Sequence, residues 1–124
     1  MWEGNPMSMK FRSGLEKRIA TQLINRKIKF KYETLRVPYT SKHNYIPDFI
    51  LPNGIIIEAK GRFVSQDRRK HLLVKEQNPE LDIRFVFSNS SSKLYKGSNT
   101  TYATWCSKHN YLFSDKDIPK EWLK

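Results

Sequence analysis

Apolar side chains recur at four-residue intervals in the segment that follows residue 13. Leu15, Ile19 and Leu23 have this spacing, which places them on one face of an α-helix. Ser13 is the predicted N-cap, and Glu16 stands three residues after it, as in a capping box. We therefore expect the first regular element of the chain to be an amphipathic helix that begins next to Ser13.

An alternation with a period of two follows that helix and predicts β-structure. The expected strands cover residues 28–37, 45–51 and 55–60. Pro38 should end the first strand, and the polar residues 39–44 should connect it to the second. Pro52-Asn53-Gly54 lies between the second and third strands, and Asn-Gly after apolar residues is a strong signal for a tight turn. These two strands should therefore form a hairpin.

The second half of the chain contains further predicted helices and one strand. Ser65 should cap a helix that Pro79 terminates. Tyr102, Trp105 and Cys106 have helical spacing and should form a core stripe. The expected elements are a helix over 66–77, a strand over 81–87, a helix over 101–108 and a final helical turn from Pro119. The resulting order, α-β-β-β-α-β-α, predicts an α/β or α+β fold in which helices flank a mixed sheet.

Composition sets the broad class of the protein. The chain has 124 residues with a formal net charge of +11, which fits one basic domain over 11–124 after a flexible segment over 1–10. Cys106 is the single cysteine, so an intrachain disulfide is excluded. No secretory signal and no apolar run near the roughly 20 residues of a membrane span is visible, so we expect a cytoplasmic protein. The charge predicts a polyanionic partner, nucleic acid rather than a membrane.

The predicted hairpin has a register that can be worked out from its turn. With a three-residue turn at 52–54, the numbers of facing residues sum to 106, so Asp48 should face Glu58. Facing side chains on one sheet surface lie about 5 Å apart. Lys60 lies two residues beyond Glu58 and shares its face, whereas Ala59 points to the other face. Two carboxylates and an ammonium group should therefore converge at one end of the hairpin.

The convergence of these charged groups indicates a site for a divalent metal ion. Two carboxylates so close repel each other and need a compensating charge, and their oxygens suit Mg²⁺ or Mn²⁺. Such an ion withdraws charge from a phosphodiester and lowers the pKa of a bound water. Lys60 would orient that water or stabilise charge that develops on the phosphorus centre, and Glu16 could supply a third carboxylate for a second ion. The simpler alternatives are that Glu16 only caps the helix and that the other three residues form an ordinary buried charge cluster.

Pro47-Asp48 followed by Glu58-Ala59-Lys60 resembles the motif of the PD-(D/E)xK nucleases. Longer blocks resemble one family within that superfamily, the phage endonuclease I family. They are FRSGLE (11–16), LPNGI (51–55), PELDIR (79–84) and KLYKGS (93–98). This resemblance extends from about Phe11 to Leu123. It implies a restriction-endonuclease-like αβββαβ core and a Mg²⁺-dependent homodimer that cuts branched DNA and resolves four-way (Holliday) junctions in the cytoplasm of a phage's host cell.

The resemblance also implies roles for individual residues. Glu16, Asp48, Glu58 and Lys60 match the family's catalytic set. Asp48, Glu58 and the backbone carbonyl of Ala59 would hold one metal ion, and Glu16 with Asp48 the second. The dimer would be domain-swapped through an extended bridge over residues 38–46, so that the first helix and strand of one chain complete the active site of the other. No nucleotide or organic cofactor is expected.

Contacts with DNA are predicted from clustered positive charge. The run Asp67-Arg68-Arg69-Lys70-His71 opens a helix, and its basic members are either a solvated face or a phosphate-contacting surface. The candidate DNA-binding residues are Arg12, Arg68, Arg69, Lys70, His71, Lys93 and Lys96. Two other functions stay open at this stage: a less selective nuclease acting on linear or single-stranded DNA, and a DNA-binding module without catalysis.

Overall fold

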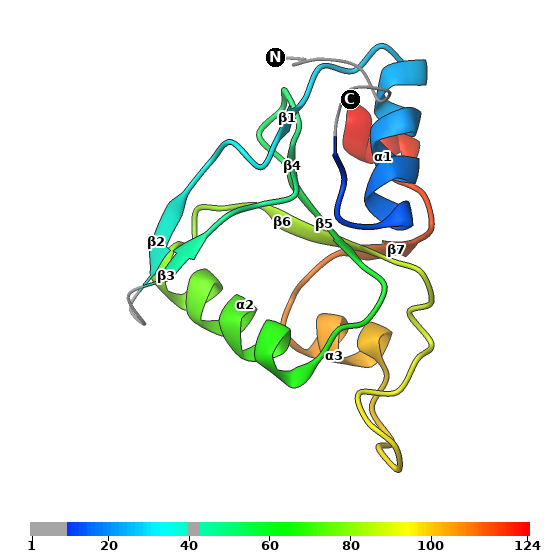
Figure 1. Ribbon diagram of the computed structural model, residues 1–124. Helices are drawn as coiled ribbons and strands as arrows, with labels where there is room; N and C mark the ends of the chain where they lie inside the picture. The colour runs from blue at the N-terminus through cyan, green and yellow to red at the C-terminus, as the bar shows by residue number, and fades with distance from the viewer. Residues whose placement is uncertain (1–9, 40–42) are drawn as a thin grey trace.

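The computed structural model describes residues 10–39 and 43–124 (Figure 1). The predicted flexible segment 1–10 therefore lies outside the described residues except for its last residue, and so do residues 40–42 of the predicted bridge. The helices are α1 (Gly14–Asn25), α2 (Ser65–Gln77), α3 (Tyr102–Lys108) and the 3₁₀ turn η1 (Lys120–Leu123). The strands are β1 (Lys31–Tyr32), β2 (Val37–Tyr39), β3 (His43–Tyr45), β4 (Phe49–Ile50), β5 (Ile56–Lys60), β6 (Ile83–Phe87) and β7 (Phe113–Asp115).

Five strands form a mixed sheet in the order β1-β4-β5-β6-β7. The pairs β5–β6 and β6–β7 are parallel, and the other two pairs are antiparallel. Helix α1 covers one face of this sheet, and α2 and α3 cover the other (Figure 1). The predicted mixed sheet flanked by helices is confirmed. No helix within residues 10–39 or 43–124 is long and apolar enough to cross a membrane.

Helix α1 begins where its capping signal predicts. The Ser13 hydroxyl accepts a hydrogen bond from the Glu16 N–H at 3.1 Å, which satisfies one of the free donors of the first turn. The Glu16 carboxylate, however, accepts from the N–H of Arg12 at 3.3 Å. The buried face of α1 carries Ile19 and Leu23, which pack on the sheet. The helix therefore both covers the sheet and brings Glu16 to its edge.

The prediction of one strand over 28–37 is wrong. The chain forms β1 at 31–32, turns at Glu33, whose φ is +53°, and pairs again only in β2. Pro38 does not end a strand but lies inside β2, opposite Asn44 of β3, which is acceptable in a two-stranded ribbon. The predicted strand 45–51 is likewise divided between β3 and β4. The alternating pattern could not reveal the first division, because it marks apolar positions and carries no signal for the left-handed turn at Glu33.

The β4–β5 hairpin agrees with its predicted register. Phe49 pairs with Ile57 and Ile50 with Ile56, so the facing numbers sum to 106 as expected. Gly54 has a φ of +91°, a left-handed conformation that glycine adopts without a steric penalty. The turn chemistry therefore fixes which residues of the two strands lie side by side.

The remaining elements follow the predictions with three differences. Helix α2 begins at Ser65 itself, Val64 occupies the N-cap position, and no side chain caps this helix. The strand predicted over 81–87 is shorter, and β7 was not predicted because three residues give too short a pattern. Thr101 caps α3, and the predicted core stripe of this helix is buried. The final turn after Pro119 is confirmed as η1.

Candidate active site

The hairpin brings Asp48 and Glu58 into direct contact. Asp48 immediately precedes β4, and its N–H donates to Glu58 Oε2 at 3.0 Å. The N–H of Ala59 in turn donates to Asp48 Oδ2 at 2.9 Å. Both residues are almost fully buried, with 3% of Asp48 and 2% of Glu58 exposed. The predicted pairing of the two carboxylates is confirmed.

Hydrogen bonds and nearby nitrogens keep Glu58 ionised. The Tyr45 hydroxyl donates to Glu58 Oε2 at 2.8 Å. The other carboxylate oxygen, Oε1, lies 3.8 Å from Lys60 Nζ and 3.7 Å from His71 Nε2. Burial by itself would raise the pKa of Glu58, but these three neighbours outweigh burial and lower that pKa to about 2.

The pKa of Asp48 is shifted in the opposite direction from that of Glu58. Burial, followed by the negative charges of Glu58 and Glu16, raises the pKa of Asp48 to about 8. The N–H of Ala59 and the charge of Lys60 oppose this rise without cancelling it. A carboxylate that ionises so reluctantly becomes more stable in its charged form when a cation lies beside it.

Lys60 lies on the same face as Glu58, as predicted. Its side chain is 16% exposed, and Nζ lies 3.5 Å from Asp67 Oδ1 at the start of α2. Burial opposes its positive charge, but the carboxylates of Glu58, Asp67 and Asp48 outweigh burial and raise the pKa of Lys60. The side chain is therefore an ammonium group at neutral pH, held between the carboxylate pair and α2.

Glu16 reaches this site from α1, the helix that covers the face of the sheet opposite α2 and α3. It is buried, and its carboxylate accepts hydrogen bonds from the Tyr32 hydroxyl and from the N–H of Arg12. Its charge contributes to the raised pKa of Asp48, so the two carboxylates are neighbours within one chain. Among the described residues, however, no three His, Cys, Asp or Glu side chains already form a cluster suited to a metal ion.

A guanidinium group lies among these carboxylates. Nη2 of Arg12 is 2.9 Å from Asp48 Oδ1 and 3.0 Å from Glu33 Oε2. Nε of the same side chain is 3.8 Å from Glu16 Oε2. Arg12 was predicted as a contact for DNA, and the structure gives it carboxylate partners inside the site.

These groups fit a hard divalent cation. Mg²⁺ and Mn²⁺ prefer carboxylate and carbonyl oxygens, and Asp48, Glu58 and Glu16 supply them at a buried position. The raised pKa of Asp48 and the guanidinium already attracted to Asp48 and Glu16 both indicate negative charge that a cation would stabilise. The roles of these residues and of the Ala59 carbonyl in metal binding remain predictions.

The raised pKa of Asp48 gives a prediction for stability. Between the ordinary pKa of 3.8 and about 8, the folded protein binds more protons than the unfolded chain, so stability falls as pH rises through this window. Asp48→Asn removes this titration, so without metal the stability of the variant relative to wild type should increase from pH 4 to pH 9. Urea unfolding in chelator at both pH values measures this difference.

Asp82→Asn is the matched control, because this aspartate side chain is 49% exposed. It should show no pH-dependent gain in the free energy of unfolding. A difference in stability between Asp48→Asn and wild type that is the same at pH 4 and pH 9 would contradict the raised pKa of Asp48.

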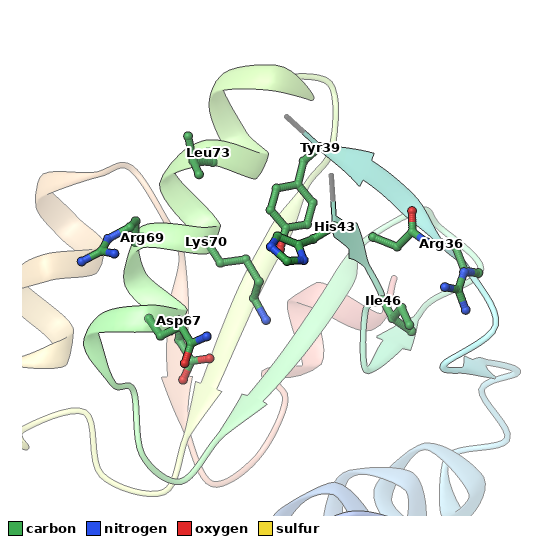
Figure 2. Close-up of a pocket in the computed structure, with 10 residues that line it drawn as sticks. Arg36, Tyr39, His43, Ile46, Asp67, Arg69, Lys70 and Leu73 are labelled. Atoms are coloured by element: carbon green, nitrogen blue, oxygen red, sulfur yellow. The ribbon is translucent and has the colours of Figure 1, made fainter. Parts of the chain in front are cut away.

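A basic pocket lies between α2 and the β2–β3 ribbon, with a volume of about 760 Å³ (Figure 2). Its lining includes the charged residues Arg36, Asp67, Arg69 and Lys70 together with His43. Figure 2 shows Lys70 extending from α2 toward the ribbon. Because Asp67 also contacts Lys60, the pocket adjoins the carboxylate site. Positive charge therefore lies next to the candidate catalytic groups.

The predicted DNA-binding residues separate into different environments. Arg69 and Lys70 line the basic pocket, and Arg68 donates to the Phe63 carbonyl at 2.6 Å. The prediction that His71 contacts DNA is wrong, because His71 is fully buried beneath Glu58. Its position three residues before the equally buried Val74 was the available signal for an inward helix face.

Lys93 and Lys96 are exposed on the segment between β6 and α3. That segment extends away from the sheet past α3 (Figure 1). The contacts predicted for these two lysines with DNA remain predictions.

Three residues of the site were not singled out from the sequence. They are Tyr45, which holds Glu58, Tyr32, which holds Glu16, and Glu33, which holds Arg12. Tyr32 lies in β1 and Tyr45 in β3, where each fits an ordinary alternating pattern. Only the fold reveals that their hydroxyl groups reach carboxylates.

The mixed sheet flanked by helices, with two carboxylates and a lysine on one hairpin, is an α+β fold with the arrangement that the motif predicted. The phage endonuclease I family matches residues 3–124 of this chain. The chain is 58% identical over 117 residues to Endonuclease I of Escherichia phage T7, covering 92% of this chain and 78% of that protein. It is 60% identical over 117 residues to Endodeoxyribonuclease 1 of Enterobacteria phage T3, with 92% and 77% covered. The chain therefore belongs to the phage endonuclease I family, as its motifs predicted.

Proposed function

We propose that this protein is a divalent-metal-dependent DNA endonuclease that cuts branched DNA near the branch point, most readily at four-way junctions. The observation that carries the proposal is the buried contact of Asp48 with Glu58 beside the Lys60 ammonium group. Membership of the phage endonuclease I family supports phosphodiester hydrolysis in DNA as the reaction. The names of the two phage relatives, an endonuclease and an endodeoxyribonuclease, agree with it.

Two Mg²⁺ or Mn²⁺ ions are the proposed cofactors. Asp48, Glu58 and the Ala59 carbonyl would hold one ion, and Glu16 with Asp48 the other. When bound, these ions would act as Lewis acids on the phosphate and increase the acidity of water. The protein's own contribution is to hold the carboxylates ready: Tyr45 and the Asp48 N–H both bind Glu58 Oε2, so the orientation of this carboxylate is set before substrate arrives.

Lys60 would stabilise charge rather than accept a proton. Its pKa is raised, so it carries its proton at neutral pH and cannot serve there as a general base. An ammonium group held by Asp67 beside Glu58 is positioned to attract the negative charge that increases on phosphate oxygens in the transition state. Asp67 thus has a positioning role in this account.

The basic pocket is the proposed path of the DNA backbone to the site. Lys70→Gln should weaken DNA binding about three-fold and reduce the salt dependence by about one released ion, because one phosphate contact is lost. Fluorescence anisotropy at several salt concentrations, with Ca²⁺ in place of Mg²⁺, measures both quantities. Lys108→Gln, an equal charge change at an exposed position on α3, is the control. Equal effects of the two substitutions would show that only net charge matters.

Junction selectivity is proposed to arise from a homodimer. Paired cuts need two sites at a fixed separation, and one described chain carries one such site. Opening of the β2–β3 ribbon would let α1 of one chain reach the site of its partner, which is the proposed domain swap. Light scattering at micromolar concentration tests the dimer, and a monomer under those conditions would contradict it.

The function itself is tested with a labelled four-way junction and a linear duplex of matched sequence, each with Mg²⁺ or with chelator. Faster, Mg²⁺-dependent cutting of the junction is the expected result. Equal cutting of both substrates would support the less selective nuclease of the same fold. Tight binding of the junction in Ca²⁺ without cutting in Mg²⁺ would support a DNA-binding module instead.

A further inference from the structure

Three carboxylates from three separate segments surround the Arg12 guanidinium. Glu16 comes from α1, Glu33 from the turn after β1, and Asp48 from the residue before β4. The closest contacts are those of Nη2 with Asp48 Oδ1 at 2.9 Å and with Glu33 Oε2 at 3.0 Å. The contact with Glu16 Oε2 is longer, at 3.8 Å. The guanidinium therefore provides the positive charge at the point where these carboxylates approach one another.

Burial differs sharply between Arg12 and its partners. The side chain of Arg12 is 63% exposed, whereas those of Glu16 and Asp48 are 6% and 4% exposed. The carboxylates are held by the fold, through Tyr32 for Glu16 and through Ala59 for Asp48. Arg12 can thus leave by rotation of its own side chain into solvent, while the carboxylates stay in place.

Two of the three carboxylates that bind Arg12, those of Asp48 and Glu16, belong to the residues proposed to hold the second metal ion. A guanidinium 2.9 Å from Asp48 Oδ1 and a metal ion bound to that oxygen would place two positive charges within a few ångströms of each other. Like charges at that separation repel, so the guanidinium disfavours binding of the metal ion at Asp48, and the metal ion disfavours the contact of the guanidinium with Asp48.

We propose that Arg12 is the resident counter-ion of the metal-free site and that a divalent cation binding to Asp48 and Glu16 displaces it. The inference rests on the proposed function, because it concerns the same carboxylates. Once displaced, the guanidinium remains tethered just before α1 at the mouth of the site. It is then free to bind a phosphate oxygen of the substrate, to which its planar donors are well suited.

Metal binding to the DNA-free protein tests this displacement of Arg12 directly, without a measurement of DNA cleavage. Titration calorimetry with Mn²⁺ should show about ten-fold tighter binding to Arg12→Gln than to wild type, since the competing cation is gone. Arg12→Lys keeps the charge and should fall between the two. Arg18→Gln is the matched control, because Arg18 is also on the α1 segment and pairs with the carboxylate of Asp117 in an exposed salt bridge.

A second measurement separates a structural role from competition. In chelator, Arg12→Gln should unfold at a lower temperature than wild type, because its three carboxylates have lost their counter-ion. Saturating Mn²⁺ should remove that difference, since the metal replaces the missing charge. A difference that persists at saturating Mn²⁺ would indicate a purely structural Arg12 and overturn the inference.

The outcomes distinguish this inference from the function on which it rests. Mn²⁺ affinity that is equal to or weaker than that of wild type in Arg12→Gln overturns the counter-ion role alone. Absence of Mn²⁺ binding in wild type and in both Arg12 variants overturns the metal-dependent mechanism as well.

Discussion

Glu58→Gln should reduce DNA cleavage by a factor of about 10³, equivalent to about 4 kcal/mol of transition-state stabilisation, while leaving the fold intact. The substitution removes one negative charge from the proposed metal site at constant side-chain size. An amide oxygen can still accept the two hydrogen bonds that Tyr45 and the Asp48 N–H donate to Glu58 Oε2. The loss should therefore appear in the cleavage rate of a variant that still unfolds cooperatively, whatever change in stability follows from the lost contacts of the charged Glu58 with Lys60 and His71.

Single-turnover cleavage of a labelled junction in Mg²⁺ measures the rate, and anisotropy in Ca²⁺ shows whether binding is retained. Glu76→Gln makes the same chemical change at an exposed position on α2 and should behave as wild type. A Glu58→Gln enzyme within ten-fold of the wild-type rate would contradict the assignment of this carboxylate to catalysis.

Phe63→Ala should lower the free energy of unfolding by about 3–5 kcal/mol, the range for removal of a buried phenylalanine ring. Phe63 is fully buried between the sheet and α3. Its ring centre lies 5.0 Å from that of Phe85 and 4.9 Å from that of Trp105. The smaller side chain would leave a cavity at the centre of this aromatic cluster, and small domains are stable by only about 5–15 kcal/mol.

Urea unfolding of the variant beside wild type measures this loss. Val64→Ala is the control, because the adjacent Val64 is 40% exposed and should change stability by no more than about 0.5 kcal/mol. A loss below about 1 kcal/mol for Phe63→Ala would show that the surrounding rings can close the gap.

The part of the site that the sequence predicted is the part carried by one hairpin. The turn at Gly54 sets the β4–β5 register, and the two-residue period of a strand then decides which face each side chain takes. Asp48, Glu58 and Lys60 could thus be placed together by counting residues. Glu58 also follows directly on the apolar run Ile55-Ile56-Ile57, where a buried strand would be expected to continue with apolar residues.

The parts that were missed depend on segments that meet only in the folded chain. The division of the predicted strand 28–37 follows from a single left-handed residue, Glu33, which no apolar pattern reveals. Arg12 reaches Asp48 across 36 positions of sequence, and His71 lies in a charged run whose inward face is marked by few apolar residues. Local patterns carry no information on such distant contacts.

The central claim is that Asp48 and Glu58 bind the catalytic metal. It is tested most directly by anomalous diffraction from crystals grown with Mn²⁺. We expect a strong anomalous peak about 2.1–2.2 Å from carboxylate oxygens of both residues, with Arg12 turned away from Asp48 when a second peak lies beside Glu16. A fully occupied Mn²⁺ site elsewhere, with Asp48 and Glu58 still bonded only to protein groups, would contradict it.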